Sequence, residues 1–126
     1  MIVAQSIPAH AHILVGNSLI IRDFETFASS HLSGSLAVHH QRGAAGIDGL
    51  IATATGLRSA VPKGAPVLLI LGDVSAAHDI GSLAAARGCE GSLTVIVVDN
   101  GGGRIFEQLP VFHSGVSEAA LSKLFT

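Results

Sequence analysis

The sequence predicts an α/β domain built on an open parallel sheet with helices on both faces. Two apolar runs, Val67–Leu71 and Leu93–Val98, contain no charge, as expected of strands buried on both faces of such a sheet. A helix-like stretch, Ala76–Arg87, separates them and completes a strand–helix–strand unit. With 126 residues, the chain is expected to form one domain, residues 1–126.

The other predicted elements continue this alternation of strands and helices, which favours a parallel sheet. In chain order they are a strand at His12–Val15, a helix through Ile21, Phe24 and Phe27, a strand at Ser35–Val38, a helix from about Leu50 to Val61, a turn at Pro62–Pro66 and a helix at Ser117–Phe125. Asn17 or Ser18 can cap the first helix. Because a final helix would normally lead into another strand, the domain is expected to be truncated at its C-terminus.

The composition predicts apolar surface in excess of what a small domain buries. Hydrophobic residues make up 48% of the chain and charged residues only 13%. A small domain has much surface relative to its volume, so some of this apolar area should remain outside the core. An alanine- and valine-rich core is one interpretation. We favour the other, an interface with a second subunit or domain, and so expect a homo-oligomer.

Several classes of protein receive no support from the sequence. The net charge is −2, without a basic run, and Trp and Tyr are absent, which argues against nucleic-acid binding. No apolar stretch approaches the ~20 residues of a membrane helix. Met1–His12 lacks the positive charge of a signal peptide. Cys89 is the single cysteine, which leaves no internal disulfide. We expect a cytoplasmic protein.

Polar residues follow both apolar runs where the strands end. Gly72-Asp73 ends the first run, and the segment Asp99–Gly103 ends the second. The carboxyl ends of neighbouring parallel strands share one edge of a sheet, so Asp73 and Asn100 could bind one cation. Carboxylate and amide oxygens suit magnesium, and the glycines allow close approach of phosphates. The alternative is a capped helix after Asp73 and a plain glycine turn after Asn100.

Basic residues near the same edge suggest a substrate with several carboxylates. Arg22, Arg42 and Arg104 lie near these loops, and a guanidinium group can bind a carboxylate bidentately. Solvated surface charge is the alternative for each of them. The adjacent His39 and His40 would face opposite sides of a strand, so packing or hydrogen bonding is favoured over a shared metal.

The helix that follows Asp73 contains further polar residues. Ser75 could cap this helix, whose N-terminus would then point at a bound anion. His78 and Asp79 are interpreted as surface or packing groups.

The Gly-Asp…Asn spacing resembles the signature of thiamine-diphosphate enzymes, in which it holds magnesium and the cofactor's diphosphate. Four segments narrow the match: Gly16–Arg22, Arg42–Gly49, Gly72–Asp79 and Val97–Phe106. From about Ile13 to Pro110, the chain resembles the C-terminal, diphosphate-binding (PP-type) domain of the MenD family. Members of this family are the 2-succinyl-5-enolpyruvyl-6-hydroxy-3-cyclohexene-1-carboxylate synthases of menaquinone biosynthesis.

This resemblance implies a transferase that decarboxylates 2-oxoglutarate on thiamine diphosphate and adds the product carbanion to isochorismate. Magnesium, or manganese, would be ligated by the side chains of Asp73 and Asn100 and by the Gly102 carbonyl. The implied cofactor-binding residues are Ile47, Gly72, Asp73, Val74, Ser75, Asn100, Gly102, Gly103, Arg104 and Ile105, and the implied substrate-binding residues are Ser18, Arg22, Arg42 and Phe106. Ile47 would press against the cofactor and help to hold its bent shape.

The sequence departs from the family pattern in three respects. Asp99 stands where the family usually has asparagine, and Arg104 replaces a typically small or amide residue. The glutamate that activates the cofactor's ring is absent, because in this family it comes from an N-terminal pyrimidine-binding domain of the partner subunit. No catalytic residue is therefore assigned in this chain.

Three hypotheses follow. The chain is part of this synthase and is inactive without the remainder; or it is a non-catalytic module that binds magnesium and diphosphate; or it comes from another thiamine-dependent decarboxylase or carboligase. The arginines favour the synthase over enzymes of neutral 2-oxo acids.

Overall fold

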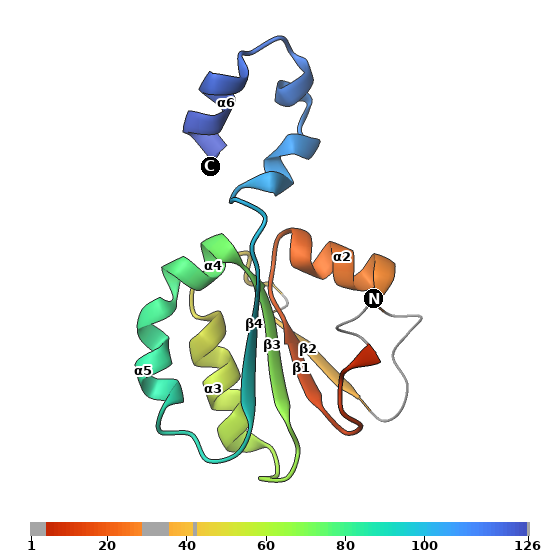
Figure 1. Ribbon diagram of the computed structural model, residues 1–126, viewed down its shortest axis with the longest axis vertical. Coiled ribbons are helices and arrows are strands. Elements are labelled where there is room, and N and C mark those ends of the chain that lie inside the picture. The colour runs from red at the N-terminus through yellow and green to blue at the C-terminus, as the bar shows by residue number, and fades with distance from the viewer. Residues whose placement is uncertain (1–4, 29–35, 42, 126) are drawn as a thin grey trace.

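The computed structural model describes residues 5–28, 36–41 and 43–125. Its centre is an open sheet of four parallel strands in the order β2-β1-β3-β4 (Figure 1). The strands are β1 (His12–Val15), β2 (Ala37–His40), β3 (Val67–Gly72) and β4 (Leu93–Val98). The predicted α/β class with an open parallel sheet is confirmed.

Helices cover both faces of this sheet (Figure 1). α2 (Leu19–Phe27) lies on one face, and α3 (Leu50–Ala60) lies on the other, beside α5 (Leu83–Ala86). The predicted positions of α2 and α3 are confirmed. None of the described helices is long and apolar enough to cross a lipid bilayer.

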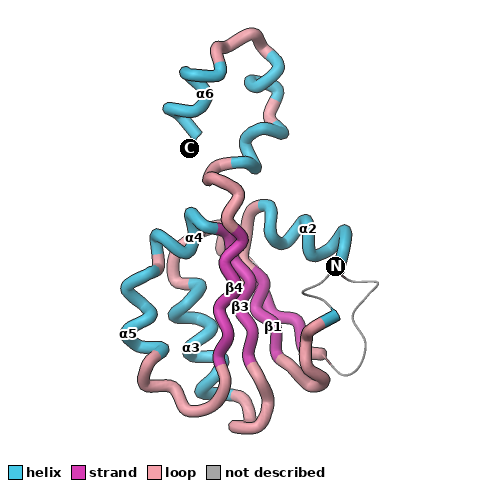
Figure 2. Tube along the Cα trace, viewed as in Figure 1, coloured by secondary structure: helices cyan, strands magenta, loops and turns pink. Residues whose placement is uncertain are grey.

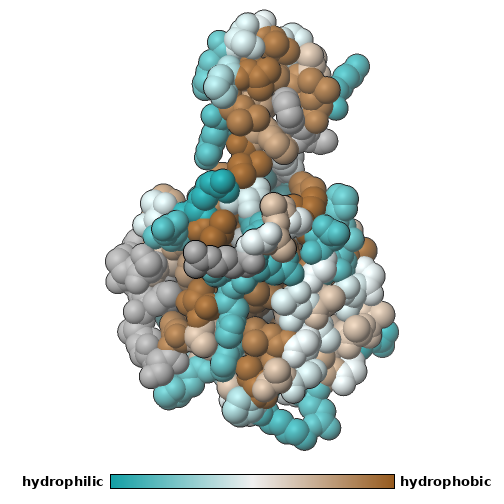
Figure 3. Space-filling view, turned by 180° about the vertical axis from the view of Figure 1, so that it is seen from behind, coloured by the Kyte–Doolittle hydropathy of each residue, from teal (hydrophilic) through white to brown (hydrophobic). Residues whose placement is uncertain are grey.

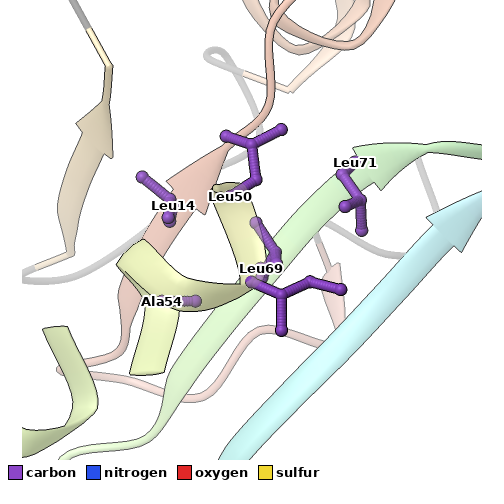
Figure 4. Packing of buried hydrophobic residues seen from close by; sticks show 6 residues of the cluster. Leu14, Leu50, Ala54, Leu69 and Leu71 are labelled. Atoms are coloured by element: carbon purple, nitrogen blue, oxygen red, sulfur yellow. The ribbon is translucent and has the colours of Figure 1, made fainter. Parts of the chain in front are cut away.

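The hydrophobic core is divided between the two faces of the sheet. The cluster between α3 and the sheet consists of Leu14, Leu50, Ile51, Ala54, Leu69 and Leu71 (Figure 4). The cluster beneath α2 consists of Ile13, Val15, Ile20 and Ile70. Because successive residues of a strand point to opposite faces, β1 and β3 contribute to both clusters. This explains why the residues of β1 and β3 are almost all apolar.

The two strands predicted to be buried on both faces differ in their environment. β3 lies between β1 and β4, and its residues Val67 to Leu71 are buried, as predicted. For β4 the prediction is wrong, because Val97 and Val98 are 47% and 39% exposed. β4 is an edge strand that pairs with β3 alone among the described strands. The apolar residues alone do not distinguish a central strand from an edge strand.

The second strand begins later than predicted. β2 starts at Ala37 rather than Ser35, which lies outside the described residues, and it extends to His40. Val38 is exposed, whereas the His39 ring stacks on the His12 ring of β1 at a centroid distance of 5.3 Å. A ring N–H of one histidine donates to the other between His12 Nδ1 and His39 Nε2, 3.0 Å apart. The predicted hydrogen-bonding role is thus confirmed for His39.

This histidine pair predicts a loss of stability in mild acid. Burial, together with the neighbouring His12, lowers the pKa of His39 below its usual value of 6.5. Stability from this residue is therefore present above pH 6.5 and is lost as the pH falls through the lower folded-state pKa. We expect the free energy of unfolding in urea to decrease between neutral pH and about pH 5, and less so in His39→Gln. The control His40→Gln should keep the wild-type pH dependence; a loss of that dependence in both variants would contradict the assignment.

The predicted helix Ala76–Arg87 is not continuous. The chain instead forms α4 (Asp73–His78), the 3-10 helix η1 (Ile80–Ser82) and α5. The break comes at Asp79, whose side chain binds a neighbouring helix, and Gly81 follows in η1. Because glycine weakens a helix and Asp79 leaves the helical conformation, helical periodicity is lost at this point.

The C-terminal segment projects beyond the carboxyl edge of the sheet (Figure 2). It contains the 3-10 helices η2 (Arg104–Gln108) and η3 (Pro110–His113), followed by α6 (Glu118–Phe125), and it thereby confirms the predicted last helix. Hydrophobic side chains are visible over this segment (Figure 3). Leu109, Val116 and Leu124 are 42%, 41% and 70% exposed, respectively. Apolar surface therefore remains outside the core, as the composition predicts.

Candidate functional site

The strand order places a cavity where the connections of the sheet diverge. In an open parallel sheet, ligands bind beyond the carboxyl ends of the strands, at the point where the strand order reverses. Here β1 and β3 are the neighbours at that point. A cavity of about 140 Å³ lies beyond them and contains most of the predicted site residues: Ser18, Ile47, Gly72, Asp73, Val74, Ser75, Asn100, Gly103, Arg104, Ile105 and Phe106.

Asp73 lies at the end of β3, next to the loop that follows β4. It is the first residue of α4 and follows β3 directly. Gly72 is paired with Val98 of β4, so the loops after both strands begin at the same level. The backbone N–H of Gly102 donates to Asp73 Oδ2 at 2.7 Å. The two motifs are therefore neighbours in space.

The loop after β4 has a backbone that favours glycine. Gly101, Gly102 and Gly103 have φ values of 82°, 80° and 49°, which side chains with a Cβ rarely adopt. The N–H of Gly101 donates to Asp99 Oδ1 at 3.0 Å, closing a local turn. This conformation turns the loop back toward Asp73, and Gly102 is buried there.

The donor set at this edge consists of hard oxygen ligands. Asp73 supplies a carboxylate, Asn100 an amide and Gly102 a carbonyl, a combination that suits magnesium together with water and phosphate oxygens. Within the described parts of the chain, no three side chains of His, Cys, Asp or Glu are grouped to hold a metal ion. A magnesium ion here would therefore rely on one carboxylate and on neutral oxygens. The chemistry of these residues fits that ion.

Arg104 is hydrogen-bonded to the residue that precedes the glycine loop. Its Nε donates to the Asn100 carbonyl at 3.0 Å, and its Nη1 forms an ion pair with Glu107. The side chains of Arg104 and Glu107 are 51% and 45% exposed, so solvent screening makes this pair a small contribution to stability. Part of the arginine's charge is thus already paired within the C-terminal segment.

The remaining predicted substrate residues are placed differently. Ser18 lies at the cavity and at the N-cap position of α2, but its side chain makes no capping bond. Arg22 is exposed, and its Nη1 donates to the Ser18 carbonyl at 2.6 Å. Of the predicted residues that the structure describes, Arg22 and Gly102 are not among those lining the cavity. Arg42 lies outside the described residues.

The predicted cap at Ser75 is wrong. α4 begins at Asp73, with Gly72 at the N-cap position and no side-chain capping bond. Ser75 therefore lies within the first turn of the helix, where it is buried and forms part of the cavity wall. Asp73 itself is the acidic residue of that turn.

A larger cavity adjoins the first one. It has a volume of about 710 Å³ and lies between the glycine loop and the C-terminal segment. The two cavities share Gly103 and Arg104. The larger one also has Glu107, His113 and Glu118 in its wall. Most of its wall comes from the projecting C-terminal segment, whereas most of the predicted site residues line the smaller cavity.

Sequence reasoning missed the role of Asp79. This residue is 8% exposed rather than a surface group. Burial raises the pKa of its carboxyl, but hydrogen bonds from Ser82, Ala52, Ile51 and Gly49 outweigh burial and hold the pKa below its usual range. The stabilisation is therefore present at neutral pH and is lost as the pH falls through the lowered folded-state pKa. The spacing Asp79-x-x-Ser82 indicates a local turn, but it gives no sign of the partner helix.

The fold and the site together define an open parallel α/β domain with a cavity at its switch point that is lined by apolar side chains and by the polar residues that follow β3 and β4. No family model matches the chain. The chain is 44% identical over 128 residues to the 2-succinyl-5-enolpyruvyl-6-hydroxy-3-cyclohexene-1-carboxylate synthase of Sorangium cellulosum, which covers 98% of this chain and 20% of that protein. The synthases of Shewanella amazonensis (47% over 109 residues) and Chlorobium phaeobacteroides (44% over 111 residues) cover 86% and 87% of the chain, respectively.

The chain is therefore homologous to 2-succinyl-5-enolpyruvyl-6-hydroxy-3-cyclohexene-1-carboxylate synthase, the MenD protein, over most of its length. It corresponds to only 18 to 20% of the length of these three relatives. The resemblance in the sequence motifs is thus supported by similarity along most of the chain.

Proposed function

We propose that this chain is the magnesium- and diphosphate-binding part of a thiamine-diphosphate-dependent synthase of menaquinone biosynthesis. The observation that carries the proposal is the contact between Asp73 Oδ2 and the Gly102 N–H, 2.7 Å apart, which joins the two halves of the motif beside the cavity. Homology to the synthases supports the choice of enzyme. The synthase is proposed to be a cytoplasmic homo-oligomer. Its N-terminal pyrimidine-binding domain, from the partner subunit, would supply the activating glutamate.

Each part of the cavity has a proposed task. Asp73, Asn100 and the Gly102 carbonyl hold the metal ion, and Ser75 and the loop Gly101–Ile105 bind the diphosphate. Ile47 and Phe106, which both line the cavity, provide apolar surface for the cofactor's ring system. Ser18, Arg22 and Arg42 are proposed to bind substrate carboxylates. When bound, thiamine diphosphate supplies the chemistry for decarboxylating 2-oxoglutarate and transferring the product to isochorismate.

We expect the isolated chain to bind magnesium and thiamine diphosphate without turning over 2-oxoglutarate. Among the described residues that line the smaller cavity there is no glutamate to activate the cofactor. Calorimetric titration of the cofactor in the presence of magnesium should show saturable heat, and a carbon dioxide release assay should show none above the protein-free control. The absence of binding would overturn the proposed function, and measurable turnover would refute the inactivity of the isolated chain.

The alternative function is that of a non-catalytic binding module, and the same lack of a glutamate favours it. Complementation separates the two. The chain would be mixed with the Sorangium cellulosum synthase from which the matching segment has been deleted, and 2-oxoglutarate decarboxylation would be measured. Restored activity that depends on Asp73 supports the synthase; binding without any restoration supports the module.

A further inference from the structure

The segment 43–49, which brings Ile47 to the cavity, is held at its N-terminal end by a side chain from another loop. Asn17 Nδ2 donates to the carbonyls of Ala44 (3.0 Å) and Gly46 (2.6 Å). Most residues of the segment are exposed, although Ile47 is partly buried. Packing against the core therefore does little to fix the segment, and its hydrogen bonds determine where Ile47 lies.

The C-terminal end of the segment is fixed by Asp79. α3 begins after Gly49, which has no side chain to cap the helix, so the first amides of the helix need acceptors from elsewhere. Asp79 Oδ2 accepts from the amides of Ile51 (2.5 Å) and Ala52 (3.2 Å), although Asp79 lies in the connection between α4 and η1. A carboxylate at this position is also favoured by the helix dipole.

The Asp79 carboxylate is itself held in place. The hydroxyl of Ser82 donates to Asp79 Oδ1 at 2.5 Å, so both carboxylate oxygens accept hydrogen bonds. A buried carboxylate with both oxygens bonded has little freedom to move. Asp79 is not among the described residues that line the cavity. Any effect that it has on a ligand must therefore pass through the start of α3 and the segment that precedes it.

We propose that Asp79 is a positioning residue that sets the place of Ile47 in the cavity wall, with Asn17 holding the other end of the same segment. The inference rests on the proposed function, because the place of Ile47 affects binding only if the cofactor occupies this cavity. Asp79 links α3 to the connection after β3, and Ile47 and Asp73 are thereby held in one arrangement.

The first test follows the ligand-free chain by nuclear magnetic resonance and compares Asp79→Asn with Asp23→Asn, an exposed site with the same change of charge. In Asp79→Asn the Ile47 methyl signals should shift and the amides of Ile51 and Ala52 should exchange faster with solvent, while the core methyls of Leu69 stay in place. Asp23→Asn should leave all of them unchanged. Unchanged Ile47 signals in Asp79→Asn would overturn the inference, whether or not the chain binds a cofactor.

The second test measures the affinity for magnesium and thiamine diphosphate. Asp79→Asn should weaken it by about tenfold, because the segment that carries Ile47 then loses a buried, charge-assisted hydrogen bond that holds it in the arrangement that binds the cofactor. In an Ile47→Ala background the same substitution should have no further effect, because no side chain is left to position. Additive effects would show that Asp79 acts by another route. Failure of the wild-type chain to bind would count against the proposed function, while the resonance data would still decide on the positioning.

A milder variant covers the case in which Asp79→Asn does not fold. Ser82→Ala removes only the hydroxyl that donates to Asp79 Oδ1. The Ile47 methyl signals should then shift, because the Asp79 carboxylate is held less firmly. The affinity for magnesium and thiamine diphosphate should fall by about twofold to threefold. A folded Ser82→Ala variant with wild-type Ile47 signals would contradict the proposal.

Discussion

Asp73→Ala is expected to reduce the affinity for magnesium and thiamine diphosphate by more than about 100-fold. Even residues that only support a metal ligand cost roughly 10- to 100-fold when they are removed, and Asp73 supplies the single carboxylate of the proposed metal site. It also accepts the Gly102 N–H, so its loss releases the glycine loop that would bind the diphosphate. Calorimetric titration with magnesium and the cofactor measures the effect.

Asp73→Asn separates the two roles of this side chain. An amide oxygen can still accept the Gly102 N–H, but it carries no charge to attract a divalent cation. We expect the Asn variant to keep the loop structure and to bind magnesium as weakly as the Ala variant. Asp23→Ala, on the exposed face of α2, serves as the control and should bind normally. Undiminished binding in Asp73→Ala would remove the metal assignment.

Arg58→Ala is expected to lower the free energy of unfolding by about 3 kcal/mol. Arg58 is only 1% exposed, and it lies in the last turn of α3. Its Nη2 donates to the carbonyls of Val61 (2.9 Å) and Pro62 (2.6 Å), and its Nη1 donates to that of Ala65. Removing the side chain takes the guanidinium donors away from these partly buried carbonyls and opens a cavity. Urea unfolding followed by circular dichroism measures the change.

The control for this prediction is Arg87→Ala. Arg87 is exposed and follows α5, so its removal should change the free energy of unfolding by less than about 0.5 kcal/mol. A similar small effect in both variants would show that the Arg58 hydrogen bonds contribute nothing net to the folded state. Arg58→Met, which keeps the volume but not the donors, should fall between them if packing supplies part of the effect.

The sequence pattern predicts the strands and helices that place apolar side chains in the core. β1, β3 and α3 fall where their apolar residues predict them, because each contributes to the core between the layers. The bounds of β2 are predicted only in part, because the predicted strand Ser35–Val38 and the observed strand Ala37–His40 share only Ala37 and Val38. His39 faces inward because it bonds His12 of another strand, and no local pattern reveals such a partner.

The candidate site also contains some residues whose position the sequence predicts and others whose contacts it does not reveal. Asp73 and Asn100 each follow a strand, so the parallel sheet alone brings them to one edge. The role of Asp79 depends on amides of a helix that is distant in the chain, which a local pattern does not reveal. Arg22 is predicted to bind a substrate carboxylate; its side chain donates to the Ser18 carbonyl one turn earlier in the chain, a local contact that the sequence pattern does not reveal.

The strand order has a consequence for the energetics of ligand binding. β1 and β2 are consecutive in the chain, as are β3 and β4, and among the described strands the two pairs are joined by the pairing of β1 with β3. The smaller cavity lies at that junction, with Ser18 and Ile47 on one side and Asp73 and Asn100 on the other. Neither half of the chain contains the site alone. A ligand that binds there is held by both halves, and by mass action its binding free energy adds to the work needed to separate them.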